Sequence, residues 1–79
     1  MIKILAFGAA VDAVDQREFE LSLDSESALL EVVNKLYERY PKLLKLPSAA
    51  FAINEEYATL EQIIKPGDTL AIIPPVSGG

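Results

Sequence analysis

The sequence ends in two glycines, Gly78 and Gly79, and what they present is a free α-carboxylate. Glycine has no side chain, so a terminal Gly-Gly can pass through a narrow channel and lie flat against another protein's backbone. Pro74 and Pro75 stand upstream, and consecutive prolines favour a stiff, extended segment. Five residues beyond Pro74 reach at most about 17 Å, enough to enter a neighbouring active site. We therefore predict an accessible carboxylate on a stiff stalk, against the alternative of a frayed terminus.

Side chains with catalytic or metal-binding chemistry are scarce in the rest of the chain. With 0 Cys and 0 His, the sequence predicts no disulfide framework, no thiolate chemistry and no metal site. An α-carboxyl has a pKa of about 3.5, so that of Gly79 is ionised at pH 7. A carboxylate is a poor electrophile and must be activated before a nucleophile can attack it.

Composition predicts one small globular domain. Of the 79 residues, 51% are hydrophobic and 24% are charged, a balance outside the range of disordered chains. The net charge is −5 and the 7 basic residues form no stripe, which argues against nucleic acid and anionic membranes as partners. An acidic domain can instead be steered toward a basic protein surface. No apolar run spans a bilayer and no signal peptide opens the chain, so the expected compartment is the cytoplasm.

The first part of the chain has the pattern of a β-hairpin. Ile2 to Phe7 is a short apolar run and predicts a strand. Gly8 to Gln16 is small and acidic and is interpreted as a connecting loop. Arg17 to Leu23 alternates apolar and polar residues, as a half-buried antiparallel strand does.

A single long helix is predicted next. Ser25 is the expected N-cap, with Glu26 favourable near the positive helix end. The helix runs to about Tyr40, because Pro41 disfavours the helical conformation in the residue before it. Its apolar stripe has the spacing of one helix face and consists of Leu29, Val32, Val33, Leu36 and Tyr40. A domain this small needs such a stripe in its core.

The second half predicts short strands joined by turns. In order these are a loop at Lys42 to Ser48 closed by Pro47, a third strand at Ala49 to Ile53, a turn at Asn54 to Glu56, and a brief return strand at Tyr57 and Ala58. Thr59 to Gln62 has capping-box spacing and predicts a short helical turn over Leu60 to Ile64. Lys65 to Asp68 fits a type II turn with Pro second and Gly third. Thr69 to Ile73 is the last strand.

This order of elements predicts the β-grasp, or ubiquitin-like, fold of the α+β class. The first and last strands are short and apolar, so we expect them to be parallel neighbours at the centre of a mixed sheet of four to five strands. One main helix then covers one face of the sheet. The expected boundaries are a β-grasp domain at 1–74 and an extended Gly-Gly tail at 75–79.

A one-helix domain leaves one sheet face uncovered. Strand alternation places Ile2, Ile4 and Ala6 on one face and Lys3, Leu5 and Phe7 on the other. If the first set is the core, Leu5, Phe7 and Ile73 form an apolar patch on the uncovered face. Tyr57 can join this patch, which then predicts a docking surface beside the tail. The alternative is that the strands are buried on both sides and are apolar for that reason.

The closing stretch, Gly67 to Gly79, resembles the end of the molybdopterin synthase small subunit, a ubiquitin-like sulfur carrier. That family ends with a Gly-Asp turn, an apolar strand, Pro-Pro-Val, a Ser or Thr, and Gly-Gly. Ala52 to Tyr57, Arg39 to Pro41 and Ile2 to Phe7 are also similar to the family, so the likeness covers the full length. The closing stretch is the specific part. Gly8 to Gln16 departs from the family, because it is acidic where members are variable and often basic.

The resemblance implies a sulfur-carrying role in molybdenum cofactor biosynthesis. An ATP-using, ubiquitin-activating-like enzyme adenylates Gly79, and a sulfur donor then displaces AMP to leave a thiocarboxylate. The tail inserts into the large subunit, in a heterotetramer of two small and two large subunits. There the sulfur builds the molybdopterin dithiolene that binds molybdenum or tungsten. The chain binds no cofactor and is no enzyme on its own, but a sulfur-carrying subunit of a sulfurtransferase complex.

The same resemblance implies roles for individual residues. Gly78 and Gly79 permit close approach, and Pro74 and Pro75 preorganise the extension. The remaining tail residues are Val76, an apolar anchor, and Ser77, a hydrogen-bonding hydroxyl; the alternative for both is an ordinary loop. The family's docking contacts with the adenylating enzyme or the large subunit fall on Phe7, Tyr57 and Ile73.

Other functions are compatible with the same features. Carriers for thiamine synthesis or tRNA thiolation share the fold and the Gly-Gly, although the Pro-Pro-Val-Ser lead-in favours the pterin pathway. A non-covalent β-grasp binding module and a protein conjugated through its terminus, as ubiquitin is, are the two alternatives of another class.

Overall fold

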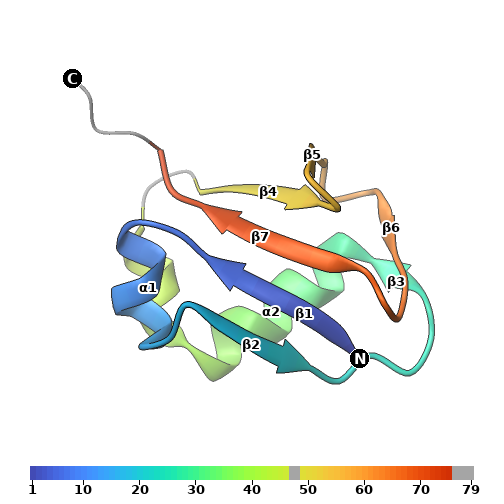
Figure 1. Cartoon of the computed structure of the whole chain (residues 1–79), viewed down its shortest axis with the longest axis horizontal. Coiled ribbons are helices and arrows are strands. Elements are labelled where there is room, and N and C mark those ends of the chain that lie inside the picture. Colours follow the sequence, from blue (N-terminus) through green and yellow to red (C-terminus); the bar gives the residue numbers. More distant parts are fainter. Residues whose placement is uncertain (47–48, 76–79) are drawn as a thin grey trace.

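A five-stranded mixed sheet forms the centre of the molecule (Figure 1). The computed structural model describes residues 1–46 and 49–75. Across the sheet the strands are β2 (Glu18–Leu21), β1 (Ile2–Ala6), β7 (Thr69–Ile73), β4 (Ala50–Ile53) and β5 (Glu56–Tyr57). The first and last strands, β1 and β7, run parallel at the centre, and the other pairs are antiparallel. The predicted fold, central pair and hairpin are confirmed, although β2 is shorter than predicted.

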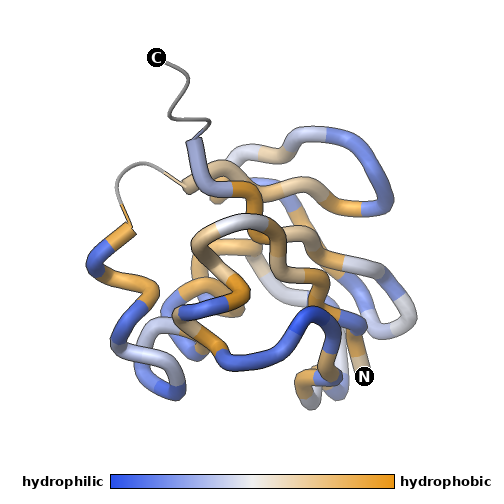
Figure 2. Tube along the Cα trace, turned by 60° about the vertical axis from the view of Figure 1, so that its left-hand side comes forward, coloured by the Kyte–Doolittle hydropathy of each residue, from blue (hydrophilic) through white to orange (hydrophobic). Residues whose placement is uncertain are grey.

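Helix α2 (Leu29–Arg39) covers one face of the sheet and lies behind it in Figure 1. The largest fully buried side chains of the described residues are Ile2, Ile4, Leu70 and Ile72 from the central strands, Leu29, Val32 and Leu36 from α2, and Ile64. Figure 2 shows hydrophobic and hydrophilic residues alternating along the described trace. Each such aliphatic side chain stabilises the fold by about 1.5–3 kcal/mol before entropy is counted. The predicted stripe of α2 is confirmed, with Tyr40 partly buried and its ring centroid 5.2 Å from that of Phe19.

The start of α2 differs from the prediction. Ser25 was the expected N-cap, but the helix begins at Leu29, after an extended Ala28 with φ −69° and ψ 143°. Ser27 and Ala28 form strand β3, which pairs antiparallel with β6 (Ile63–Ile64).

Backbone carbonyls from the segment before β6 cap this helix. The N–H of Leu29 donates to the carbonyl of Gln62 at 2.8 Å, and that of Leu30 donates to the carbonyl of Leu60 at 3.0 Å. The first N–H groups of a helix have no partner within it, so these tertiary bonds satisfy them in place of a side-chain cap.

The segment from Thr59 to Gln62 also differs from the prediction. The N–H of Thr59 donates to Gln62 Oε1 at 3.0 Å, which is half of the predicted capping box. The N–H of Gln62 donates back to the Thr59 carbonyl at 3.1 Å and closes a turn. The helical turn predicted over Leu60 to Ile64 is wrong, because Ile63 and Ile64 pair with β3 instead.

Two predicted loops contain short helices. Gly8 to Gln16 contains α1 (Ala9–Val14), whose alanines favour helix and whose Ala10 and Val14 are buried. The predicted loop at Lys42 to Ser48 overlaps the 3₁₀ helix η1 (Pro41–Lys45). This helix packs against α1 and buries Leu43. Pro47 and Ser48, the predicted end of that loop, lie outside the described residues. None of the helices within 1–46 and 49–75 is long and apolar enough to cross a bilayer.

The two predicted turns that flank β7 and β5 are confirmed. Gly67 has φ 93° and the N–H of Asp68 donates to the Lys65 carbonyl at 3.0 Å, as in a type II turn. Asn54 and Glu55 have φ 50° and 73°. Two successive left-handed residues are the signature of a type I′ hairpin turn.

The two residues of β6 should contribute very differently to the free energy of unfolding. Ile64 is 0% exposed and Ile63 is 54% exposed. Ile64→Ala removes a core side chain and is expected to lower the free energy of unfolding by about 2–4 kcal/mol. Ile63→Ala, the matched control, should lower it by less than about 1 kcal/mol. Urea unfolding of both variants measures the difference; equal losses would contradict the placement of β6.

Candidate docking face and tail base

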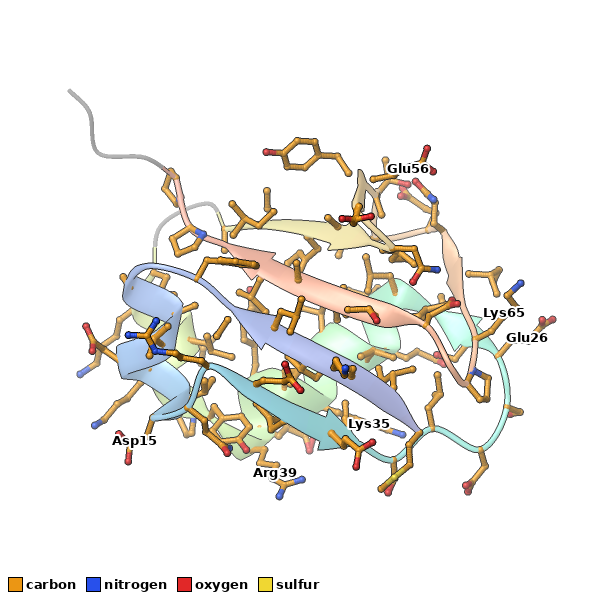
Figure 3. All side chains as sticks on the ribbon, in the orientation of Figure 1. Asp15, Glu26, Lys35, Arg39, Glu56 and Lys65 are labelled. Carbon is orange, nitrogen blue, oxygen red and sulfur yellow. The ribbon has the colours of Figure 1, made fainter. Side chains whose placement is uncertain are left out.

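The sheet face opposite α2, the docking face hereafter, faces the viewer in Figure 3. Strand register gives one row straight across it: Glu18 on β2, Leu5 on β1, Ala71 on β7, Ala52 on β4 and Tyr57 on β5. Neighbours in such a row lie side by side on the same face. Phe7, Ile73 and Ala50 lie on the same face, one step along the strands toward the tail. Glu20, Lys3 and Thr69 lie on it one step in the opposite direction.

The predicted docking residues surround a hollow on this face. The hollow has a volume of about 290 Å³, and its apolar lining is Leu5, Phe7, Ala52, Tyr57, Ala71 and Ile73. Alanines at the middle of the central row leave room between the larger side chains. Phe7 is 49% exposed and Tyr57 is 75% exposed, which excludes the alternative that both sheet faces are buried at these two positions. The structure thus brings Phe7, Tyr57 and Ile73 together; their docking role stays a prediction.

A polar hollow of about 360 Å³ continues the apolar one toward the start of β1, away from the tail. It shares Leu5, Glu55 and Thr69 with the apolar hollow and adds Lys3, Glu18 and Asn54. Lys3 Nζ lies 3.7 Å from Glu18 Oε2, with both side chains about half exposed. Such an exposed pair contributes at most about 1 kcal/mol. The docking face is therefore apolar beside the tail and charged away from it.

Strand alternation placed Lys3 on this face, but sequence reasoning did not place the acidic residues Glu18 and Glu55 there. The signal was present, because Glu18 and Glu20 alternate with Phe19 and Leu21 along β2 and so share a face with Leu5. Glu55 carried no such signal, since its position depends on the hairpin turn. The described part of the chain contains no group of three or more His, Cys, Asp or Glu side chains able to hold a metal ion.

The base of the tail leaves the sheet next to Phe7. Strand β7 ends at Ile73, after which Pro74 is half-buried and Pro75 exposed. Gly8 has φ 53° and ψ −129°, a conformation that residues with a side chain rarely adopt. A Cβ built on Gly8 would lie 3.8 Å from Pro74 Cγ, so the corner between β1 and α1 lies against the first tail proline.

The remaining tail residues are outside the described residues. They are Val76, Ser77, Gly78 and Gly79. Their predicted roles in insertion and as the activated carboxylate stay predictions, as does the boundary between a domain at 1–74 and a tail at 75–79.

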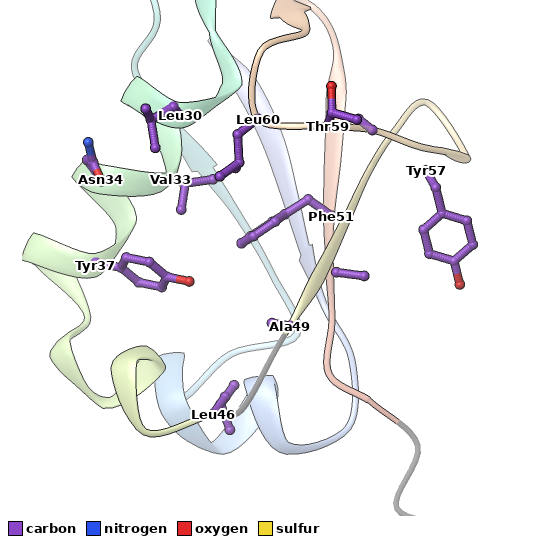
Figure 4. A pocket seen from close by; sticks show the side chains of 12 residues that line it. Leu30, Val33, Asn34, Tyr37, Leu46, Ala49, Phe51, Tyr57, Thr59 and Leu60 are labelled. Atoms are coloured by element: carbon purple, nitrogen blue, oxygen red, sulfur yellow. The ribbon is translucent and has the colours of Figure 1, made fainter.

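A second groove, on the helix side, was not predicted. It has a volume of about 370 Å³ and lies between α2 and β4, lined among others by Leu30, Tyr37, Phe51 and Leu60 (Figure 4). Figure 4 also shows Tyr57 on the opposite side of β4 from Phe51, in agreement with its place on the docking face.

The turn before β7 holds an ionised carboxylate. The N–H of Lys65 donates to Asp68 Oδ2 at 2.9 Å, and Asn54 Nδ2 donates to Asp68 Oδ1 at 3.1 Å. The bond from the Lys65 backbone, then that from Asn54, hold the pKa of Asp68 below its usual value, with a smaller effect from the Lys65 charge; burial opposes them. Hydrogen bonds to the charged form favour that form.

Asp68→Asn predicts a pH-dependent difference in stability. Because the pKa of Asp68 is lower in the folded chain than the unfolded value of about 3.9, its stabilisation is complete above about pH 5 and is lost as the pH falls through the folded pKa. The gap in melting temperature between wild type and variant should therefore shrink as the pH falls from about 7 to about 3. Thermal unfolding across that range measures it; a constant gap would count against the ionised contacts.

The fold and this site define a ubiquitin-like β-grasp domain with one open sheet face beside its C-terminal strand. The sequence matches the ThiS family over residues 4–79. A relative from Arabidopsis thaliana is 37% identical over 79 residues, covering 99% of this chain and 82% of its own length. One from Dictyostelium discoideum is 39% identical over 82 residues, covering 98% and 94%. Both are named molybdopterin synthase sulfur carrier subunit.

Solved structures share the fold. SAMP1 from Haloferax volcanii superposes with a TM-score of 0.86 at 23% identity, covering 99% of this chain and 98% of its own. A chain in the complex of subunits 1 and 2 of the molybdopterin-converting factor from Helicobacter pylori superposes with a TM-score of 0.67 at 22% identity. The match covers 99% of this chain and 97% of that one. The chain belongs to the ThiS family of sulfur carriers, and the resemblance predicted from its closing stretch is confirmed.

Proposed function

We propose that this chain is the sulfur carrier subunit of a molybdopterin synthase and works in molybdenum cofactor biosynthesis. The observation that carries the proposal is the name shared by relatives 37% and 39% identical over nearly the whole chain. The Pro-Pro-Val-Ser-Gly-Gly ending supports the pterin pathway over thiamine synthesis or tRNA thiolation. The proposed setting is the cytoplasm, in a heterotetramer with two large subunits.

The chemistry of the proposal takes place on the α-carboxylate of Gly79. One carboxylate oxygen attacks the α-phosphorus of ATP on the adenylating enzyme, and pyrophosphate leaves. A sulfide equivalent from a sulfur donor attacks the acyl carbon and expels AMP, which leaves a thiocarboxylate. Its sulfur is the nucleophile that the large subunit directs at the pterin precursor. Its attack forms a C–S bond to the precursor and joins it to Gly79 as a thioester. Water then attacks the acyl carbon and breaks the C–S bond to Gly79, which leaves the sulfur on the pterin and restores the carboxylate.

The chain's own contribution is to present this terminus. The apolar hollow lies beside the base of the tail, so a protein docked on Phe7, Tyr57 and Ile73 is in position to receive the residues that follow Pro74. The exposed carboxylates of Glu18 and Glu55, with a net charge of −5, favour a partner surface that is basic around its apolar centre. Charge complementarity of this kind raises the association rate and fixes orientation more than it raises affinity.

Deletion of Gly79 tests the chemical part of the proposal. The shortened chain ends at Gly78 and places its carboxylate one residue, about 3.5 Å, short of both active sites. Sulfur transfer to the pterin precursor is expected to be abolished, while the melting temperature stays close to that of wild type. A synthase assay and thermal unfolding measure the two effects. Wild-type activity in the deletion variant would reject the proposal.

The mass of the protein purified from its native host separates the alternatives. A gain equal to one oxygen-to-sulfur exchange on Gly79 supports the carrier. An unmodified terminus in cells that are making the cofactor supports a non-covalent binding module, and isopeptide-linked adducts on other proteins support conjugation.

Phe7→Asp tests the docking part of the proposal. A charge at the wall of the apolar hollow is expected to raise the Kd for the adenylating enzyme by about 30-fold, the effect of losing a hot-spot side chain of about 2 kcal/mol. Leu44→Asp is the matched control, because Leu44 is 66% exposed on η1, outside the lining of the hollow. Calorimetric titration of both variants gives the comparison. Equal affinities, or an unfolded Phe7→Asp variant, would count against the docking face.

A further inference from the structure

We propose that Asn54 and Asp68 are positioning residues for partner docking, because they hold the β4–β5 hairpin in the one geometry that sets Tyr57 at the rim of the apolar hollow. This inference rests on the proposed function, since the place of Tyr57 matters only if a protein docks on this face. Neither residue lines the apolar hollow. Both act through the backbone that carries Tyr57.

The two side chains join three segments by hydrogen bonds. Asn54 Nδ2 donates to Asp68 Oδ1 at 3.1 Å, and Asp68 Oδ2 accepts from the N–H of Lys65 at 2.9 Å. Asn54 Oδ1 accepts from the N–H of Thr69 at 3.0 Å, and the N–H of Asn54 donates to the Thr69 carbonyl at 2.9 Å. The turn of the hairpin is thereby fixed to the turn before β7 and to the first residue of β7 itself.

The hairpin needs such support for two reasons. Strand β5 has two residues and lies at the edge of the sheet, paired with β4 on one side. Its turn places Asn54 and Glu55 in the left-handed region, with φ 50° and 73°. Asparagine tolerates that region better than most residues, but the second position of a type I′ turn favours glycine, and here it is glutamate. The side-chain bonds of Asn54 offset this local strain.

Tyr57 depends on the hairpin for its position. It is 75% exposed, so packing within the chain does little to fix its ring. What fixes it is the register of the hairpin, in which Tyr57 pairs with Ala52 above the floor of the hollow. Glu55, the second left-handed position and the residue before β5, lines both the apolar and the polar hollow. Freeing the turn would therefore displace one apolar and one acidic member of the docking face together.

Population arithmetic sets the size of the effect. A partner that binds one hairpin geometry sees an apparent Kd raised by the inverse of the fraction of molecules in that geometry. Loss of the Asn54 side-chain bonds that leaves the docking geometry about one-fifth populated would raise the Kd about fivefold. The buried core side chains lie on the other side of the sheet and should keep their packing.

The test is a double-mutant cycle on the full chain, with the molybdopterin synthase large subunit of the same organism as the probe. Asn54→Gly keeps a residue that accepts a positive φ and removes the two side-chain bonds. It is expected to raise the Kd about fivefold. In a Tyr57→Ala background the same change should raise the Kd by less than about twofold, because the side chain it positions is gone.

Two further readouts separate positioning from a general structural effect. Asp68→Asn keeps an acceptor for the Lys65 N–H but loses the match to Asn54 Nδ2, so its Kd should fall between those of wild type and Asn54→Gly. In the free protein, NMR resonances of Tyr57 should broaden or shift in Asn54→Gly, while those of the buried Ile4 and Leu70 stay in place. These two buried residues are internal controls for an intact core.

Several outcomes would overturn the inference. They are wild-type affinity in Asn54→Gly, the same fold-loss with and without the Tyr57 ring, and unchanged Tyr57 resonances. If wild type itself does not bind the large subunit, the proposed function fails and the docking role of the hairpin fails with it. If wild type binds and Asn54→Gly binds equally well, only the positioning role fails.

Discussion

The parallel pairing of β1 with β7 is the interaction on which the rest of this structure depends. Ile4 lies opposite Leu70 and Ala6 opposite Ile72, and these four side chains face α2, nearly or wholly buried. Period-two alternation then fixes the opposite face, where Leu5 and Ala71 lie side by side. The same pairing brings the end of β7 next to Phe7 and Gly8. The docking hollow and the base of the tail are adjacent for this one reason.

Much of this could be predicted because it is encoded in local patterns. Short apolar runs at both ends of the domain predict central strands, and the stripe from Leu29 to Leu36 predicts a helix that covers one sheet face. Pro66 and Gly67 predict their turn from backbone preference alone. Alternation along β1 also predicts which of its side chains lie on the open face. These features need no knowledge of what the rest of the chain does.

The features that were missed depend on contacts distant in sequence. The start of α2 is set by carbonyls of Leu60 and Gln62, so the strong local signal at Ser25 is overridden. Ile63 and Ile64 pair with β3 although Thr59 to Gln62 has the spacing of a capping box. Short helices such as α1 are marginal on their own and form here because Ala10 and Val14 reach the core. The polar half of the docking face required the register across four strands before Glu18 and Glu55 could be placed together.

Pairing between the first and the last strand also has a consequence for synthesis of the protein. Residues 3–6 must wait for residues 69–72 before the centre of the sheet can close, and pairing over so long a stretch of chain makes folding slow. A nascent chain that stops short of Thr69 leaves the apolar side of β1 without its neighbour and cannot complete the domain. Chains truncated before Thr69 therefore expose apolar surface that proteases recognise. A completely folded domain contains the strand that leads to the tail.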